Sequence, residues 1–268
     1  MSNPYQLPDG NVLISFSGGR TSGYMLHKIL EVNGELPERV RVAFANTGRE
    51  MPETLDFVQE CSERWGVKIN WLEYDRKDGK VSFKNVNHNS AARNGEPFNK
   101  LINFRQTLPN IAWRYCTVDM KVKTIRRFLI QLGWDFWHNT VGIRADESHR
   151  VKSSPDKRCY NWYPLHKANV SVNDVLKFWS SHSFDLKVIK GGGNCDGCFL
   201  KSEATLAAML KNYPSRMKWW VDAEQRIGTQ FHKTRSYQGL NDFVQRQGDW
   251  IFDDEAYLCQ ADDGECTG

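Results

Sequence analysis

Residues 12–26 have the sequence VLISFSGGRTSGYML, in which an apolar run passes through a glycine pair into a segment that can form a helix. Short apolar runs rich in Val and Ile favour a buried strand, so the stretch predicts a strand, a loop and a helix start. Glycines let the backbone approach an anion, and the N–H groups and dipole of a helix N-terminus stabilise it. Hydroxyl groups at Ser17, Thr21 and Ser22 and the cation of Arg20 add to these donors. The stretch therefore predicts a phosphate-binding loop.

The spacing of the glycines excludes two familiar phosphate-binding motifs. A P-loop needs a glycine, four residues and then Gly-Lys-Ser/Thr, and the sequence contains no such string. The dinucleotide fingerprint needs Gly-x-Gly, whereas Gly18 and Gly19 are adjacent. The alternative is a plain strand-to-helix turn that needs small residues, and the motifs farther along the chain favour the anion loop over it.

The composition is that of a globular protein of ordinary charge. The 268 residues include 36 basic and 32 acidic residues, giving a formal net charge of +4, which permits anionic ligands without requiring nucleic acid. No basic start precedes an apolar N-terminal segment, and no apolar run has the length of a membrane span, so we expect a cytoplasmic protein with no membrane partner. Its seven cysteines are then better suited to metal binding or catalysis than to disulfides.

Strand and helix patterns alternate along the chain. They predict strands at 11–16, 40–45, 69–72 and 138–143 and helices at 21–32, from Pro52 onward and at 118–132. Alternation of this kind predicts an α/β fold, with a mostly parallel twisted sheet and helices on both faces. Ligands of such sheets bind beyond the C-terminal strand ends, where the glycine loop and the Asn46-Thr47-Gly48 segment both fall.

Two units are expected along the chain. Residues 1–190 form the nucleotide-binding α/β domain, in which the polar segment 75–100 is interpreted as a long loop that covers the site. Ser171 and Asp174 predict a capping box at the start of a helix. Residues 191–268 form a cysteine-containing helical extension packed on this domain, with a helix over 202–226 interrupted at Pro214.

Five motifs follow one another along the sequence. They are SGGRTS at 17–22, NTGREMPET at 46–54, RYCT at 114–117 followed by Lys121, GIRADESHR at 142–150 and YPL at 163–165. In this order they resemble the phosphoadenosine phosphosulfate (PAPS) reductase-like family of the PP-loop ATP-pyrophosphatase superfamily. The resemblance implies an adenine nucleotide alpha-hydrolase-like fold and sulfur chemistry on a bound adenine nucleotide.

The resemblance also implies a site at the C-terminal edge of the sheet that takes ATP, PAPS or its unphosphorylated analogue APS. The phosphate, sulfate or pyrophosphate end is held by Ser17, Gly18, Gly19, Arg20, Thr21 and Ser22. The adenosine lies near Asn46, Thr47 and Gly48. Substrate binding is assigned to Arg114, Lys121, Arg144, Asp146 and Arg150. Guanidinium groups suit this role because they bind phosphate or sulfate through two N–H groups.

The cysteine pattern points to a metal. Cys195 and Cys198 have Cys-x-x-Cys spacing behind a glycine-rich segment, and the resemblance implies that they join Cys116 in binding a [4Fe–4S] cluster. Iron–sulfur members of the family carry a second cysteine where this sequence has Thr117. The fourth ligand is therefore open, with Cys159, Cys259, Cys266 or no protein ligand as alternatives. Structural Zn²⁺ is the alternative metal, and unligated thiols are the remaining one.

The C-terminal Glu265-Cys266 resembles the Glu-Cys-Gly motif of the reductases, although Thr267 replaces the glycine. This likeness implies that Cys266 is a catalytic nucleophile that attacks the sulfur of a sulfonucleotide, with a thioredoxin-like partner as reductant. The alternative role for Cys266 is metal binding with Cys259.

Three functions follow. The first is reduction of PAPS or APS to sulfite, the second an ATP pyrophosphatase-type sulfurtransferase acting on a nucleic acid or another target, and the third a non-catalytic nucleotide-binding module with a structural metal. The cluster cysteines and Cys266 favour the first, and the intact Ser-Gly-Gly loop suits the pyrophosphate leaving group of the second.

Overall fold

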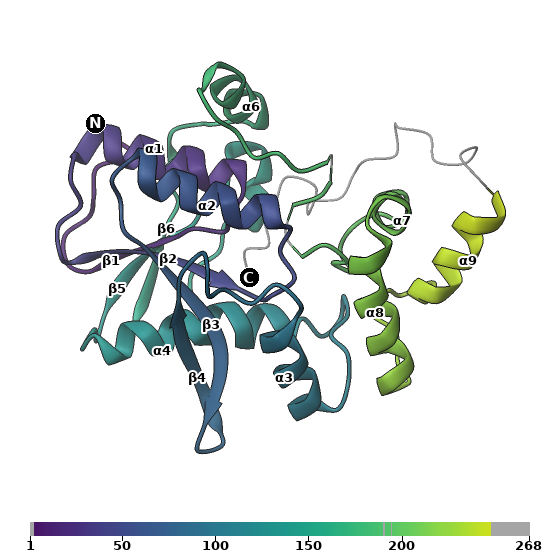
Figure 1. Ribbon diagram of the computed structural model, residues 1–268. Coiled ribbons are helices and arrows are strands. Elements are labelled where there is room, and N and C mark those ends of the chain that lie inside the picture. The colour runs from purple at the N-terminus through teal and green to yellow at the C-terminus, as the bar shows by residue number, and fades with distance from the viewer. Residues whose placement is uncertain (1–2, 190, 194, 248–268) are drawn as a thin grey trace.

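A twisted sheet lies at the centre of the computed structural model, which describes residues 3–189, 191–193 and 195–247 (Figure 1). Within these residues the sheet has six strands in the order β4-β3-β2-β1-β5-β6. The strands are β1 (Val12–Ser15), β2 (Val40–Asn46), β3 (Ile69–Lys77), β4 (Lys80–Val86), β5 (Trp137–Thr140) and β6 (Cys159–Trp162). All neighbours pair in parallel except β3 and β4, which pair antiparallel. The predicted mostly parallel α/β fold is confirmed.

Helices cover both faces of this sheet (Figure 1). One face carries α1 (Arg20–Asn33) and α2 (Pro52–Arg64), and α6 (Val172–Ser181) packs on α1. The other face carries α4 (Thr124–Gln131), which continues the π-helical segment η1 (Thr117–Lys123). The predicted helices at 21–32, after Pro52 and over 118–132 are thereby confirmed.

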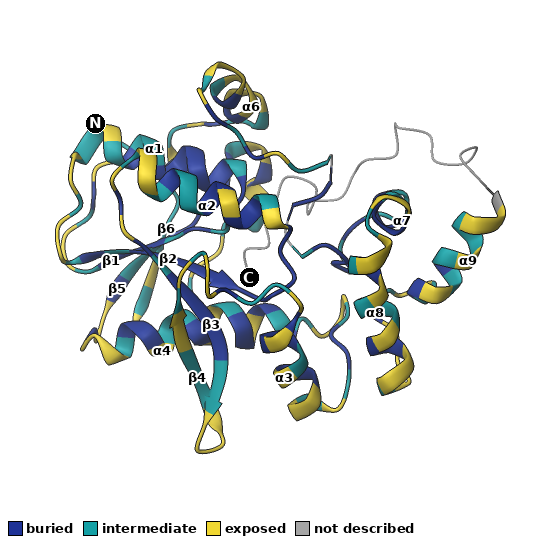
Figure 2. Cartoon of the chain, in the orientation of Figure 1, coloured by how far each residue is buried: buried dark blue, intermediate teal, exposed yellow. Residues whose placement is uncertain are grey.

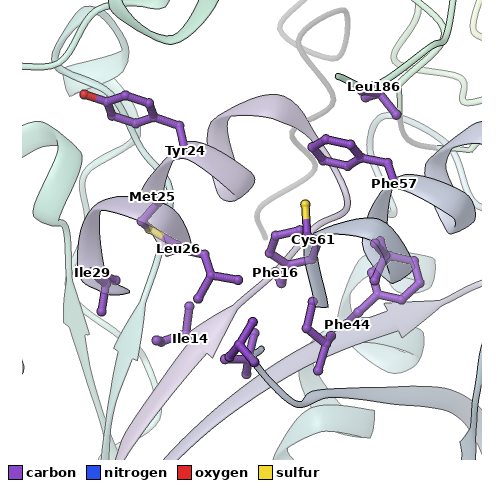
Figure 3. Close-up of a cluster of buried hydrophobic side chains, with 14 of the residues drawn as sticks. Ile14, Phe16, Tyr24, Met25, Leu26, Ile29, Phe44, Phe57, Cys61 and Leu186 are labelled. Atoms are coloured by element: carbon purple, nitrogen blue, oxygen red, sulfur yellow. The ribbon is translucent and has the colours of Figure 1, made fainter. Parts of the chain in front are cut away.

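The central strands β1 and β2 are mostly apolar and mostly buried, as expected for a sheet that is covered on both faces (Figure 2). Ile14 and Phe16 point into the core beneath α1 and α2, where they meet Met25 and Phe44 (Figure 3). Leu13 lies between these alternating positions, so its side chain points to the opposite face of the sheet and packs in the separate core beneath α4. Burial on both faces fixes the register of β1, so the end of this strand and the loop after it are rigidly placed.

The prediction of a long covering loop over 75–100 was wrong. Strand β3 continues to Lys77, turns at Asp78-Gly79 and returns as β4, and α3 (Glu96–Arg105) follows. Both turn residues have positive φ, the geometry that makes Asp-Gly a strong hairpin signal. The polarity that suggested a loop belongs to β4, a half-exposed edge strand on which charged side chains discourage pairing with other chains.

A second hydrophobic core holds the C-terminal helices against the sheet domain. The helices are α7 (Glu203–Asn212), α8 (Pro214–Ile227) and α9 (Tyr237–Gln247), so the expected interruption at Pro214 is confirmed. Trp220 of α8 and Tyr237 of α9 share this core with Phe98 of α3 and Met51 at the end of the β2 loop. The described part of the extension therefore packs on the α/β domain, while the boundary at residue 190 stays a prediction.

The remaining elements are short. They are the 3₁₀ segment η2 (Ala145–Arg150) and α5 (Pro164–Lys167). Across the described residues, the structure contains no helix with both the length and the apolar character that a membrane crossing requires.

Replacing Ser171 with alanine is expected to lower the free energy of unfolding by about 1 kcal/mol, because this residue caps α6. The predicted capping box is present: the Ser171 hydroxyl accepts the N–H of Asp174, and the Asp174 carboxylate accepts the N–H of Ser171 at 2.8 Å. Urea unfolding measures the loss. The control is Ser180→Ala, an exposed position in the same helix, and an equal loss there would contradict the capping role.

Candidate nucleotide and cysteine site

The glycine loop lies directly on the helical layer. Gly18 has φ +84°, and a Cβ placed on it would lie 2.8 Å from Thr54 Cγ2 and 3.1 Å from the Phe44 ring, so only glycine fits. The Ser17 hydroxyl donates to Ser22 Oγ at 2.9 Å, and Ser22 in turn donates to the carbonyl of Gly19 at 2.9 Å. Helix α1 begins at this loop without a side-chain cap and without an acidic residue in its first turn. The positive end of its dipole therefore faces the loop unopposed by a carboxylate of that turn.

Arg20 and Arg144 both approach this loop but have different partners. The Arg20 guanidinium makes two bonds to the Asp185 carboxylate, at 2.7 and 2.8 Å, and a third to the carbonyl of Leu186 at 2.6 Å. This ion pair ties Asp185 to the start of α1. The contribution of Arg20 to the predicted anion site is then its backbone N–H at the helix start.

Arg144 joins the segment after β5 to the glycine loop. Its side chain is buried, with Nη1 donating to Thr21 Oγ1 at 3.1 Å and Nε donating to Asp146 at 3.1 Å. Glu147, also buried, forms ion pairs with Arg144 and with Arg150. Three of the predicted substrate-binding residues thus gather in and beside η2, next to the hydroxyl of Thr21.

The end of β2 is held rigidly at the same edge of the sheet. The buried Asn46 amide donates to Glu73 at 2.7 Å and to the carbonyl of Ala92 at 2.9 Å, while its oxygen accepts the N–H of Gly48. The Thr47 hydroxyl donates to the Glu50 carboxylate at 2.9 Å and lies 3.2 Å from the sulfur of Cys195. The predicted adenosine-side segment is therefore in contact with one of the predicted metal ligands.

Buried charges fasten the Cys-x-x-Cys segment to this β2 loop. The Asp196 carboxylate is fully buried and accepts bonds from Arg49 at 2.6 Å, Arg216 at 2.7 Å and the Trp220 indole at 2.6 Å. We refer to Arg49, Asp196 and Arg216 as the charge latch. A Cβ on Gly197 would lie 2.6 Å from the Trp220 ring, so the close approach of this segment to α8 requires glycine. Sequence reasoning missed the latch, for which Asp196 between the two cysteines was the available signal.

Two of the three predicted metal ligands, Cys195 and Cys198, flank Asp196 of this latch. Cys198 donates its N–H to the carbonyl of Cys195 at 3.2 Å, and Cys116 and Cys195 both pack against the second core. Burial raises the pKa of the Cys195 thiol, as does the nearby Glu50 carboxylate, whereas the cation of Lys121 lowers it. Lys121 is thus placed to act on the thiol and not only on a substrate anion.

These cysteines fit a thiolate-bound metal by their chemistry but only partly by their arrangement. Among residues 3–189, 191–193 and 195–247, no group of three or more His, Cys, Asp or Glu side chains surrounds a common metal position. A resident cluster would draw on Cys116, Cys195 and Cys198 and supply redox or sulfur-carrying chemistry beside the nucleotide.

One alternative for the fourth ligand, Cys159, lies within the described residues and is remote from Cys195. Cys159 pairs with Trp137 at the N-terminal edge of the sheet. Through the pairing of β5 with β1 and of β1 with β2, this level corresponds to residue 39, which is eight residues before Thr47. At about 3.3 Å per residue this is roughly 25 Å, so Cys159 does not reach Cys195. Cys259 and Cys266 lie outside the described residues.

A cavity of about 360 Å³ lies between the sheet and η1, below the glycine loop. Its wall includes Ser17, Ala45 and Lys121, which are parts of the predicted site, together with side chains on β1, β5 and β6. On the sheet side, the Ser15 hydroxyl donates to Asn139 at 2.8 Å and the Asn139 amide donates to Asn161 at 3.2 Å. The size and the few convergent polar groups are those of a small-molecule pocket.

The parallel sheet, the Ser-Gly-Gly loop and the basic segment after β5 define an α/β protein of the PP-loop superfamily. Within that class, residues 11–186 match the model of the phosphoadenosine phosphosulfate reductase domain, and the chain belongs to this family. The match covers the sheet, the glycine loop and η2, and it ends before the Cys-x-x-Cys segment.

Several known proteins are similar to the chain. The uncharacterized nin region protein ORF290 of Escherichia phage lambda is 28% identical over 207 residues, which are 75% of this chain and 69% of that protein. An uncharacterized 37.8 kDa protein of Escherichia phage 186 is 21% identical over 253 residues, with 80% and 75% covered.

Two solved structures are also similar, each at 15% identity. The PAPS reductase of Candida auris in its phosphate complex has a TM-score of 0.42, with 67% of this chain and 79% of that chain covered. The U34-tRNA thiolase NcsA of Methanococcus maripaludis with its [4Fe–4S] cluster has a TM-score of 0.45, with 89% and 82% covered.

Proposed function

We propose that this chain binds an adenine nucleotide across the C-terminal edge of the sheet and carries out sulfur chemistry on it. The observation that carries the proposal is the contact between Thr47, on the loop after β2, and the thiol of Cys195. The anionic end of the nucleotide lies on the glycine loop and Arg144, and its adenosine occupies the cavity beside Ala45.

The first proposed reaction is reduction of PAPS or APS. The Cys266 thiolate attacks the sulfur, the bond between sulfur and the phosphate oxygen breaks, and adenosine 3′,5′-bisphosphate or AMP leaves. A thioredoxin-like dithiol then cleaves the resulting Cys266 thiosulfonate, releases sulfite and becomes a disulfide, which supplies the two electrons. Arg144 supports this reaction because it offers positive charge where the anionic leaving group forms.

The second candidate is ATP-dependent sulfur transfer to a nucleic acid, with release of AMP and pyrophosphate. The glycine loop supports it, because the loop leads into the N-terminus of α1, whose first turn carries no acidic residue and can stabilise a pyrophosphate. An exposed aromatic and basic surface along α3 also favours this candidate.

Incubation with PAPS and a dithiol is expected to release sulfite, and Cys266→Ser is expected to abolish this release, because no other residue is assigned the attack on sulfur. Cys61→Ala is the matched control, since Cys61 is buried in the core beneath α1 and α2 and does not line the cavity. Sulfite release by Cys266→Ser at the unmodified rate would remove the nucleophile role. Formation of AMP and pyrophosphate from ATP, with no sulfite from PAPS, would assign the second reaction instead.

Anaerobically purified protein is expected to contain iron and sulfide and to absorb visible light, because Cys116, Cys195 and Cys198 are proposed to hold a [4Fe–4S] cluster. Cys195→Ser is expected to lose most of the iron, and Cys159→Ser to retain it. Metal and sulfide analysis measures both. A colourless protein that contains zinc and no iron would contradict the cluster and support a structural metal.

A further inference from the structure

An exposed aromatic and basic surface adjoins the site along α3 and the segment that follows it. Phe104 and Trp113 are each 50% exposed, although both are large apolar residues. The Arg76 guanidinium lies 3.3 Å from the Phe104 ring centroid, and that of Arg105 lies 5.8 Å from both the Phe104 and the Trp113 rings. These four side chains form one continuous surface, which we call the α3 platform. Single exposed aromatic residues are ordinary, but a contiguous group indicates a binding surface.

Trp113 is held in its exposed position. Asn110 and Trp113 exchange two backbone hydrogen bonds, at 3.1 and 3.3 Å, and the Asn110 side-chain oxygen accepts the N–H groups of Ala112 and Trp113 at 3.0 Å. The indole also packs edge-on against Tyr115 with ring centroids 5.3 Å apart. Little conformational freedom then remains to be lost when a ligand stacks on this ring.

The chain segment that carries Phe104, Arg105 and Trp113 is predominantly basic, although Lys100 pairs with Asp75 and Arg126 with Asp156. Residues 96–127 contain seven basic and two acidic residues, an excess of five, whereas the whole chain has a net charge of +4. One of the two acids, Asp119, is buried and already paired with Arg105 and Lys123. The surface therefore attracts a polyanion, and its exposed aromatic faces suit a polyanion that carries flat rings.

We propose that the α3 platform binds single-stranded nucleic acid, with bases stacked on Phe104 and Trp113 and phosphates on the neighbouring basic side chains. A single strand fits because its bases are available for stacking, whereas those of a duplex are not. Trp113 is three residues before Cys116, so a strand on the platform lies beside the cysteine site. The inference rests on the proposed function, in which such a strand is the acceptor of the second reaction.

Fluorescence anisotropy with labelled oligo-dT and oligo-U of about twelve nucleotides tests the platform in the full-length protein without added nucleotide. The double variant Phe104→Ala/Trp113→Ala is expected to bind at least about tenfold more weakly, because each stacked base contributes to affinity. The control is Phe136→Ala, whose aromatic ring is 60% exposed just before β5, and it is expected to bind like the unmodified protein. For about three phosphate contacts, the logarithm of the affinity should fall with the logarithm of salt at a slope of about −2. Preference for oligo-dT or oligo-U identifies the type of strand.

Three results would overturn the proposal: no binding by the unmodified protein at low salt, an unchanged affinity of a correctly folded double variant, or an equal loss in Phe136→Ala. Binding of a blunt duplex or of polyglutamate as tightly as the single strand would also overturn it, and would assign the surface to duplex or to an acidic protein. Titration with ATP on the same samples separates the two proposals. Retained ATP binding with no oligonucleotide binding rejects the platform alone, and the reverse rejects the adenine-nucleotide site.

Discussion

Asp196→Ala is expected to lower the free energy of unfolding by about 3–5 kcal/mol, because it leaves a buried cation without its partner. Arg49 is only 3% exposed, and burial lowers its pKa while Asp196 acts in the opposite direction. The carboxylate also accepts the indole N–H of the buried Trp220 at 2.6 Å, and this donor loses its partner as well. Urea unfolding followed by tryptophan fluorescence measures the change.

The chain offers a matched control for this experiment. Asp185 also pairs with an arginine through two bonds, but its side chain is 36% exposed and that of Arg20 is 30% exposed. Solvent screens such a pair, so Asp185→Ala is expected to cost less than about 1 kcal/mol. Asp196→Ala should in addition speed the labelling of Cys195 and Cys198 by a thiol reagent, since the charge latch holds their loop. Equal losses in the two variants, with unchanged labelling, would refute the latch.

The fold was predictable from the sequence where local pattern and burial agree. Strand β1 is indicated by its short apolar run, and the start of α2 is indicated by Pro52. Both signals lie in a few neighbouring residues, and both elements were predicted. The β3–β4 hairpin was missed because its second strand lies at the edge, half exposed, and only Val81 and Phe83 mark its apolar face between polar residues. Its Asp78-Gly79 turn was the stronger signal.

The candidate site was predictable in its residue types and not in its pairings. Motif order identified the glycine loop, the β2 end and the basic segment after β5, because each motif is contiguous. Arg20 belongs by sequence to the loop, yet its side chain pairs with Asp185, 165 residues away. The latch joins Arg49 to Asp196 across 147 residues. Only the folded chain shows which of several basic residues meets which acid, since these partners are set by packing.

Arg144→Ala is expected to weaken the binding of ATP and of PAPS by about 10- to 100-fold. A hydrogen bond to a charged group contributes about 1.5–3 kcal/mol, and Arg144 is buried beside the hydroxyl of Thr21, where water competes little. The variant should fold, because the buried Glu147 keeps its ion pair with Arg150. Isothermal titration calorimetry measures the affinity, and circular dichroism confirms the fold.

Two further variants separate charge, geometry and mere proximity to the loop. Arg144→Lys keeps the cation but loses the two-pronged guanidinium, so its affinity should lie between those of the alanine variant and the unmodified protein. Arg20→Ala removes a cation that is nearer in sequence to the glycine loop, but the Arg20 side chain is 30% exposed and solvent screens its charge, so the affinity should change by less than about threefold. If Arg20→Ala loses as much affinity as Arg144→Ala, the nucleotide responds to the summed positive charge around α1. If only Arg144→Ala loses it, the anionic end of the nucleotide lies between η2 and the glycine loop, because that is where the Arg144 guanidinium meets Thr21.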